Sequence, residues 1–133
     1  MREINTILLV DDDKDDQYFF YKALEEADPS VTLLAAGNGA DALEKLKFAR
    51  PDIILLDLVM PVMNGVAFLR KVKADKQLRD IPVIVYTSDL SIFKEKEVLA
   101  LGAEKIIYKP LDFEGTVRII RNLAAFFHLK QSA

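Results

Sequence analysis

The sequence predicts an α/β fold of the doubly wound class, with five parallel strands and five helices. Short apolar, β-branched runs alternate along the chain with segments of helical periodicity. These runs are continuously apolar, which is typical of strands buried on both faces. The expected strands cover residues 6–10, 32–36, 52–57, 82–87 and 105–108.

A helix is expected after each strand. The last one has the clearest periodicity, with apolar residues at alternating steps of four and three, and the fourth, around 91–101, has the weakest. The apolar faces are formed by Phe20, Ala23, Leu24 and Ala27; Leu43 and Leu46; Val66, Leu69 and Val72; Val98, Leu99 and Leu101; and Phe113, Val117, Ile120, Ala124 and Phe127.

Capping residues and helix breakers fit the same elements. Asp28-Pro29 should end the first helix, because proline cannot continue one. Asn38 and Asn64 can cap the second and third helices through their side-chain oxygens. Gly102 suits a left-handed residue after the fourth helix.

Composition narrows the class of protein. At 133 residues and 51% hydrophobic, the chain is expected to form one domain over 1–133. A net charge of −3 disfavours nucleic-acid binding, and the lack of Cys excludes disulfides and Cys-based zinc sites. No apolar run approaches the ~18 residues of a membrane span, and the first ends at Asp11, which is unlike a signal peptide. We therefore expect a cytoplasmic protein without membrane contact.

Four of the apolar runs stop at polar residues, of three chemical kinds: carboxylates, a hydroxyl and an ammonium. These residues are Asp11 with Asp12, Asp57, Thr87 and Lys109. In an open parallel sheet the carboxyl ends of the strands converge on one edge, where such folds bind ligands. Several carboxylates, one lysine and one hydroxyl at that edge indicate a site for a divalent cation and a phosphoryl group.

The carboxylates of Asp11, Asp12 and Asp57 form a candidate metal site. Carboxylates brought together from two strand ends repel one another, and a hard cation relieves that repulsion. Mg²⁺ is the natural candidate, since it binds through one or two carboxylates and keeps waters and substrate oxygens. The acids that follow are interpreted as a helix cap and surface charge: Asp13, Asp15 and Asp16.

Lys109 and Thr87 supply groups for a phosphoryl oxygen. Lys109 precedes Pro110, and a cis peptide bond there would aim the lysine across the sheet edge. Its ammonium can pair with a carboxylate at rest and hold a phosphoryl oxygen after transfer. Thr87 can donate its hydroxyl to such an oxygen, and the small Ser88 leaves room for it.

These residues form an ordered set, and the set resembles the receiver domain of bacterial two-component response regulators across essentially the whole chain. The set comprises Asp11-Asp12, Asp57 with Met60-Pro61-x-x-Asn64-Gly65, Thr87-Ser88 and Lys109-Pro110. The resemblance implies a flavodoxin-like sheet with strand order 2-1-3-4-5. It also implies that Asp57 accepts a phosphoryl group from a histidine kinase or a histidine phosphotransfer protein.

The resemblance further implies roles for the other residues. Asp12, Asp57 and the backbone carbonyl of Val59 would bind Mg²⁺ directly. Asp11 would act partly through water. The phosphoryl oxygens would be held by two side chains, Lys109 and Thr87.

The resemblance also implies how a signal would leave the domain. As a stand-alone receiver the protein would bind a downstream effector through the fourth helix, the last strand and the last helix, where Ile92 and Phe93 are either exposed contact residues or core. Ile106 stands where the family often has Tyr or Phe, a ring that takes part in the family's usual switch. Tyr108 lies on the same strand face by the two-residue period. A signalling module that assists its own phosphorylation and dephosphorylation, not a metabolic enzyme, is expected.

Two other classes of protein stay open at this point. A Mg²⁺-dependent phosphatase of the haloacid-dehalogenase kind also places an aspartate nucleophile after its first strand, and Asp11-x-Asp13 fits its opening motif. The chain is short for that class and has no obvious cap domain. A flavodoxin-like nucleotide binder would need a Gly/Ser/Thr-rich phosphate loop, whereas residues 11–16 are mostly acidic.

Overall fold

The computed structural model describes the backbone of residues 4–60, 64–90 and 95–132, and side chains in these ranges up to residue 127. The elements follow one another as β1 (Thr6–Val10), α1 (Lys14–Ala27), β2 (Thr32–Ala36), α2 (Gly39–Leu46), β3 (Ile53–Leu56), α3 (Gly65–Ala74), β4 (Val83–Thr87), α4 (Glu95–Ala100), β5 (Lys105–Tyr108) and α5 (Phe113–Ser132). The strands form one five-stranded parallel sheet in the order β2-β1-β3-β4-β5. The expected fold class and strand order are therefore confirmed.

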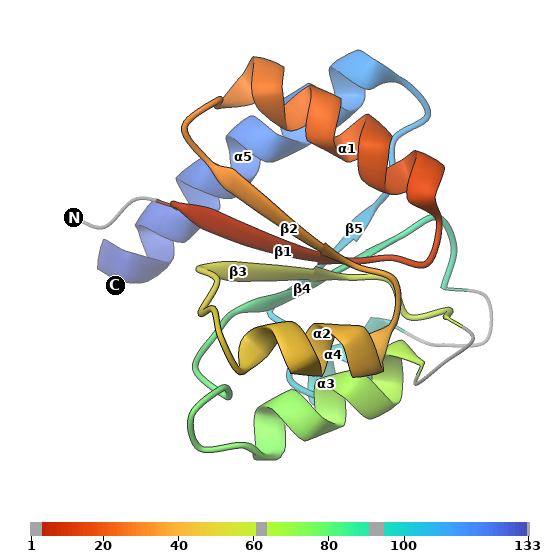
Figure 1. The fold of residues 1–133 in the computed structure, drawn as a ribbon, viewed down its shortest axis with the longest axis vertical. Helices are drawn as coiled ribbons and strands as arrows, with labels where there is room; N and C mark the ends of the chain where they lie inside the picture. Colours follow the sequence, from red (N-terminus) through yellow and green to blue (C-terminus); the bar gives the residue numbers. More distant parts are fainter. Residues whose placement is uncertain (1–3, 61–63, 91–94, 133) are drawn as a thin grey trace.

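Helices cover both faces of the sheet. In Figure 1, α1 and α5 lie on one face, and α2, α3 and α4 lie on the other. Each face has its own core, in which side chains of alternate strand residues meet the apolar side of the helices. Phe20 and Phe127 pack in the core under α1 and α5, and Phe68 packs in the core under α3.

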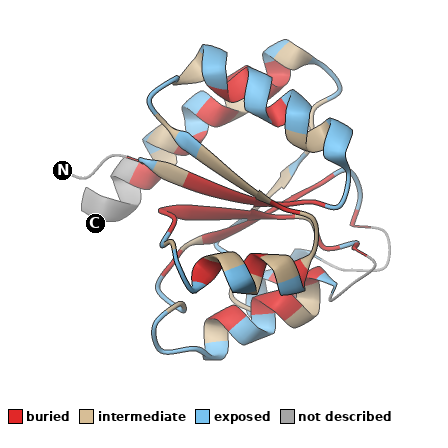
Figure 2. Cartoon of the chain, viewed as in Figure 1, coloured by how far each residue is buried: buried red, intermediate tan, exposed pale blue. Residues whose placement is uncertain are grey.

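The central strands are buried most completely. Every residue of β3 and β4 is buried, and so are the last four residues of β1, as the red strands of Figure 2 show. The edge strands β2 and β5 are mostly half-buried or exposed. This is the burial that continuous apolar runs predict for the middle of a parallel sheet.

The predicted helix ends are also confirmed. Asp28 is the C-cap of α1, and Asn38 and Asn64 accept backbone N–H groups of the first turns of α2 and α3 at 2.8 and 3.0 Å. Gly102, two residues after α4, has a φ of +114°, and a Cβ there would lie 2.8 Å from the Lys73 side chain. A glycine at this position therefore satisfies both the backbone conformation and the close packing.

The fourth helix is short in the part of the chain that the structure describes. Val98 is its buried residue, while Leu99 is exposed and Leu101 is half-buried. The candidate contact residues Ile92 and Phe93 lie outside the described residues. No helix within the described ranges is long and apolar enough to cross a membrane.

Candidate functional site: the carboxyl edge of the sheet

The hydrogen-bond ladder of the sheet extends one residue past several strands. The backbone N–H of Asp57 donates to the carbonyl of Val10 at 3.0 Å, and that of Lys109 donates to the carbonyl of Thr87 at 2.8 Å. Asp11 is fixed in the same way, by a 2.9 Å bond to Ala36. The residues after the strands are thus placed by the sheet itself, and their side chains meet at its carboxyl edge.

The ammonium of Lys109 lies at the centre of this edge. Its Nζ is 2.6 Å from Asp11 Oδ2 and 3.2 Å from Asp57 Oδ2. The Lys109 side chain is 11% exposed, and those of Asp11 and Asp57 are 1% and 13% exposed. These buried contacts match the resting pairing with a carboxylate that the sequence predicts.

The structure corrects one sequence interpretation of this edge and adds to another. It has no cis peptide bond among the described residues, so the Lys109–Pro110 bond is trans, and the lysine reaches the acids without a re-aimed backbone. Asp16 is half-exposed, as a surface charge would be, but its carboxylate also lies 3.0 Å from Lys109 Nζ, a contact that was not predicted. The sequence held a signal for this contact, because Asp16 is one helical turn before buried Phe20 and shares its inward face.

The other two acids at the start of α1 are placed as expected. Asp13 is the N-cap, and its Oδ1 accepts the backbone N–H groups of Asp15 and Asp16 at 2.8 and 3.2 Å. Asp15 is exposed. This cap fixes the first turn of α1 and with it the position of Asp16.

The carboxylate of Asp57 has two further donors nearby, one at the end of β4 and one in the loop after β3. The Thr87 hydroxyl lies 3.3 Å from Asp57 Oδ1 and 3.2 Å from the carbonyl of Asp89, so its one hydrogen can go to either acceptor. The backbone N–H of Val59 donates to Asp57 Oδ1 at 3.1 Å. Thr87 is buried, which keeps its hydroxyl close to the carboxylate.

The electrostatics of the edge follow from burial and pairing. Burial raises the pKa of Asp11 above its ordinary value, and the hydrogen bonds from Lys109 and from the Asp13 backbone offset this only in part. Burial alone would lower the pKa of Lys109, but the hydrogen bonds and charges of its acidic neighbours outweigh it and raise that pKa. Lys109 therefore carries its positive charge at neutral pH.

A divalent cation fits the acidic side of the edge. Single carboxylate oxygens of Asp11, Asp12 and Asp57 lie within 4.8 Å of one another. All three donors are hard oxygen ligands, which suit Mg²⁺. Asp12 is exposed, and no described residue pairs with its carboxylate, so it is open to a ligand. The structure thus brings together the three predicted carboxylates.

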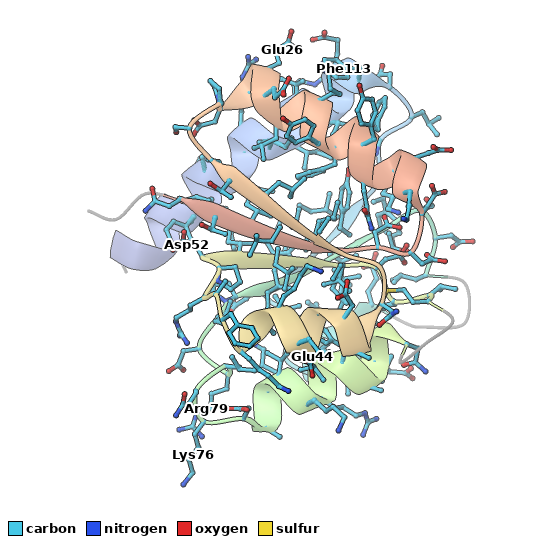
Figure 3. All side chains as sticks on the ribbon, in the orientation of Figure 1. Glu26, Glu44, Asp52, Lys76, Arg79 and Phe113 are labelled. Atoms are coloured by element: carbon cyan, nitrogen blue, oxygen red, sulfur yellow. The ribbon has the colours of Figure 1, made fainter. Side chains whose placement is uncertain are left out.

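An acid at the opposite end of β3 is structural. Asp52, labelled in Figure 3 at the amino end of the sheet, accepts the backbone N–H groups of Asn5 and Thr6 at 2.7 and 2.9 Å. It ties the start of β1 to the start of β3. Two acids therefore flank β3 with different roles. Asp57, at the carboxyl edge, is part of the candidate site, whereas Asp52, at the amino edge, holds two strands together.

The face expected to carry the signal contains a side-chain hydrogen bond between β5 and α4. The Tyr108 hydroxyl on β5 donates to Glu95 Oε1 at the start of α4, at 2.7 Å. Ile106 is half-buried and packs against the core that includes Val98 of α4. The two residues share a strand face, as the two-residue period predicts, and both contact the α4 side of the sheet.

The first residue of α3, Gly65, lies very close to the backbone of Asp57 and Leu58. A Cβ on Gly65 would lie 2.5 Å from Leu58 Cα and 2.6 Å from the Asp57 carbonyl oxygen. The Gly65 N–H donates to the carbonyl of Leu58 at 3.0 Å. Glycine is required here because α3 begins against the backbone that carries the central carboxylate.

The fold and this edge define a class: doubly wound α/β domains whose carboxyl edge combines acids, a lysine and a hydroxyl. A family model for the response regulator receiver domain matches residues 7–121. The chain therefore belongs to the response regulator receiver domain family.

Individual relatives agree with this assignment. A protein-glutamate methylesterase/protein-glutamine glutaminase of Clostridium acetobutylicum is 41% identical over 78% of this chain, but the match covers 30% of that relative. Protein PilH of Pseudomonas aeruginosa is 32% identical over 90% of this chain and 97% of its own length. The crystal structure of the phosphorylated cyanobacterial phytochrome response regulator RcpA superimposes with a TM-score of 0.80 at 26% identity, covering 93% of this chain and 94% of that one.

Proposed function

We propose that this receiver domain accepts a phosphoryl group on Asp57, with Mg²⁺ bound by the neighbouring acids. The observation that carries the proposal is the environment of the Asp57 carboxylate. One oxygen faces the Lys109 ammonium, the other faces the Thr87 hydroxyl and the Val59 N–H, and Asp11 and Asp12 lie beside it. Donors on both oxygens orient a nucleophile and are in place for the charge that a phosphoryl group adds.

The chemistry is a phosphoryl transfer between nucleophiles. An oxygen of Asp57 forms the bond to phosphorus while the bond from phosphorus to the donor's histidine nitrogen breaks. The imidazole keeps that electron pair and takes up a proton when it leaves. Lys109 and Thr87 then hold phosphoryl oxygens. Asp11, Asp12, Asp57 and the Val59 carbonyl would hold Mg²⁺, which supplies positive charge to the phosphoryl oxygens when bound.

The partners follow from this role and remain predictions. The donor is a sensor histidine kinase or a histidine phosphotransfer protein. The output is phosphorylation-dependent binding of an effector protein at the α4, β5 and α5 face, supported by the Tyr108–Glu95 contact. Three further expectations likewise stay predictions: that residues 1–133 form a single receiver domain, that the domain acts in signalling and not as a metabolic enzyme, and that it is cytoplasmic.

The phosphatase alternative is not favoured. It needs the second aspartate of Asp11-x-Asp13 free for proton transfer. Asp13 instead caps α1, with Oδ1 occupied by two backbone N–H groups. The acid is thus engaged in the structure of the helix.

Intact-mass measurement after incubation with acetyl phosphate and Mg²⁺ tests the proposal. We expect one added phosphoryl group on the parent protein and on Asp80→Asn, a matched control at an exposed acid in the loop before β4. Asp57→Asn should take up none. Phosphorylation of Asp57→Asn to the parent level, or no phosphorylation of the parent, would contradict the assignment.

A further inference from the structure

Lys109 has three carboxylate partners, and the third comes from a helix. An ammonium has three N–H donors. Their acceptors are Asp11 at 2.6 Å, Asp16 at 3.0 Å and Asp57 at 3.2 Å. Asp11 and Asp57 follow strands of the sheet, whereas Asp16 lies in the first turn of α1.

A cation at the edge would affect these three partners unequally. Asp11 and Asp57 belong to the group of acids that can share a metal ion, and Asp16 does not. A divalent cation on Asp11 and Asp57 neutralises them as partners of Lys109 and repels the ammonium. Of the three, Asp16 alone keeps its full charge for the lysine.

Among the described residues, no fourth carboxylate pairs with Lys109. A cavity of about 40 Å³ on this side of the edge is lined by Asp16, Lys109, Pro110, the rings of Phe19, Phe20 and Tyr86, and Thr116. The ammonium lies 5.9 Å from the centre of the Tyr86 ring, and the Thr116 hydroxyl, which donates to the carbonyl of Asp112, is uncharged. Without Asp16, an ammonium displaced by a cation has only neutral groups and solvent as alternatives.

Asp16 itself is held where this contact requires. Its backbone N–H donates to the Asp13 cap at 3.2 Å, and one turn later Phe20 packs edge-on against Tyr86 with ring centres 5.8 Å apart. A carboxylate in the first turn is also favoured by the positive end of the helix.

We propose that Asp16 is a positioning residue: it keeps the Lys109 ammonium at the edge while a cation occupies Asp11 and Asp57, so that the lysine remains available to a phosphoryl oxygen. This inference rests on the proposed roles of Lys109 and Mg²⁺. Through Asp16, helix α1 would take part in the phosphoryl site together with the residues at the strand ends.

The first test observes the lysine without and with Mg²⁺. The ¹⁵N-labelled ammonium of Lys109, assigned by its loss in Lys109→Met, should give a protected NMR signal in the parent under both conditions. Asp16→Ala should weaken this signal in the metal-free protein, where Asp11 and Asp57 still accept, and abolish it with Mg²⁺ bound. Asp15→Ala is the matched control, since it removes an exposed acid from the same helical turn, and it should leave the signal unchanged. A parent-like signal in Asp16→Ala with Mg²⁺ bound would overturn the proposal.

The second test is a double-mutant cycle on Mg²⁺ affinity, measured by calorimetry. Released from Asp16, the ammonium moves onto Asp11 and Asp57 and competes with the cation. Asp16→Ala should therefore weaken Mg²⁺ binding about five-fold, the modest effect expected at a half-exposed acid. In the Lys109→Met background its effect should fall to that of Asp15→Ala.

The outcomes separate this inference from the proposed function. Equal weakening by Asp16→Ala in both backgrounds would mean that Asp16 acts only as a nearby charge, which overturns the positioning role. Failure of the parent to bind Mg²⁺ would count against the metal site. The Lys109 signal of the parent and of Asp16→Ala, compared without Mg²⁺, would still show whether Asp16 helps to hold the ammonium.

Discussion

Tyr108 and Glu95 are joined by a hydrogen bond of 2.7 Å that links β5 to the first turn of α4. Tyr108 directly precedes Lys109, so this contact lies one residue from the ammonium at the sheet edge. Movement of Lys109 on phosphorylation would therefore be transmitted along β5 to a residue that holds α4. This link stands near the position where Ile106 replaces the aromatic residue expected of the family's switch.

Replacing Tyr108 by Phe removes the hydroxyl and keeps the ring. We expect faster amide hydrogen exchange in α4 and a weaker response of α4 to beryllofluoride, because the hydrogen bond that couples the helix to β5 is lost. Hydrogen exchange with and without beryllofluoride measures this. Tyr18→Phe, at an exposed tyrosine of α1, is the control. If both variants match the parent, Tyr108 takes no part in the response.

Mg²⁺ should stabilise the folded chain, because the ion binds a site that the unfolded chain lacks. At ten times its dissociation constant it should add about 1.4 kcal/mol to the free energy of unfolding. Asp12→Asn should reduce this gain and leave the metal-free fold intact, since it also removes carboxylate repulsion. Thermal unfolding with and without millimolar Mg²⁺ is the measurement. Glu26→Gln, at the far end of α1 in Figure 3, should behave like the parent. A melting temperature that Mg²⁺ does not change would contradict the proposed metal site.

Variants of Lys109 and Thr87 should separate phosphorylation of Asp57 from the structural change that accompanies it. Lys109→Ala and Thr87→Ala should still take up some phosphoryl group on Asp57. Both should lose most of the accompanying structural change, because each variant lacks a side chain that we propose contacts the phosphoryl oxygens, from the residue after β5 or from the end of β4. NMR spectra before and after beryllofluoride provide the comparison. Parent-like shifts in both variants would show that the role assignments are wrong.

The buried phenol of Tyr86 should make the stability of the folded chain depend on pH in the alkaline range. Burial raises the pKa of Tyr86 from 10.0 to about 12. Between these values the unfolded chain has lost the phenol proton and the folded chain retains it, so stability falls as pH rises through this window. The loss reaches on the order of 2 kcal/mol at its upper end. Lys109, whose pKa is also raised, contributes in the same direction above 10.5.

Urea unfolding at pH 8 and pH 11 measures this dependence. Tyr86→Phe should lose less stability between the two pH values than the parent, because its ring has no proton to lose. Tyr18→Phe serves as the control at an exposed ring. An equal loss in Tyr86→Phe and the parent would contradict the assignment to Tyr86.

The sequence was informative wherever local chemistry decides structure. Continuous apolar runs predicted the central strands, and Asn38 and Asn64 act as the caps their type suggests. The convergence of Asp11, Asp57 and Lys109 followed from the rule that parallel strand ends share an edge.

The missed contacts and the one error arose where a contact depends on packing between elements. Asp16 is a charged residue, which is usually exposed, and its contact with Lys109 depends on how α1 packs on the sheet. The Tyr108–Glu95 bond requires the distance between β5 and α4, which spacing along the chain does not give. The trans Lys109–Pro110 bond shows that β5 aims the lysine adequately without a change of peptide geometry.

The glycine at the start of α3 limits how this domain can vary. Because the Gly65 backbone lies against both the Asp57 carbonyl and the Leu58 Cα, a larger residue would move the main chain of the proposed phosphoacceptor itself. The acid and the glycine are therefore expected to be inherited together, although the glycine has no side chain. Anyone diversifying this domain to accept new partners can randomise the exposed faces of its helices, but must keep position 65 fixed.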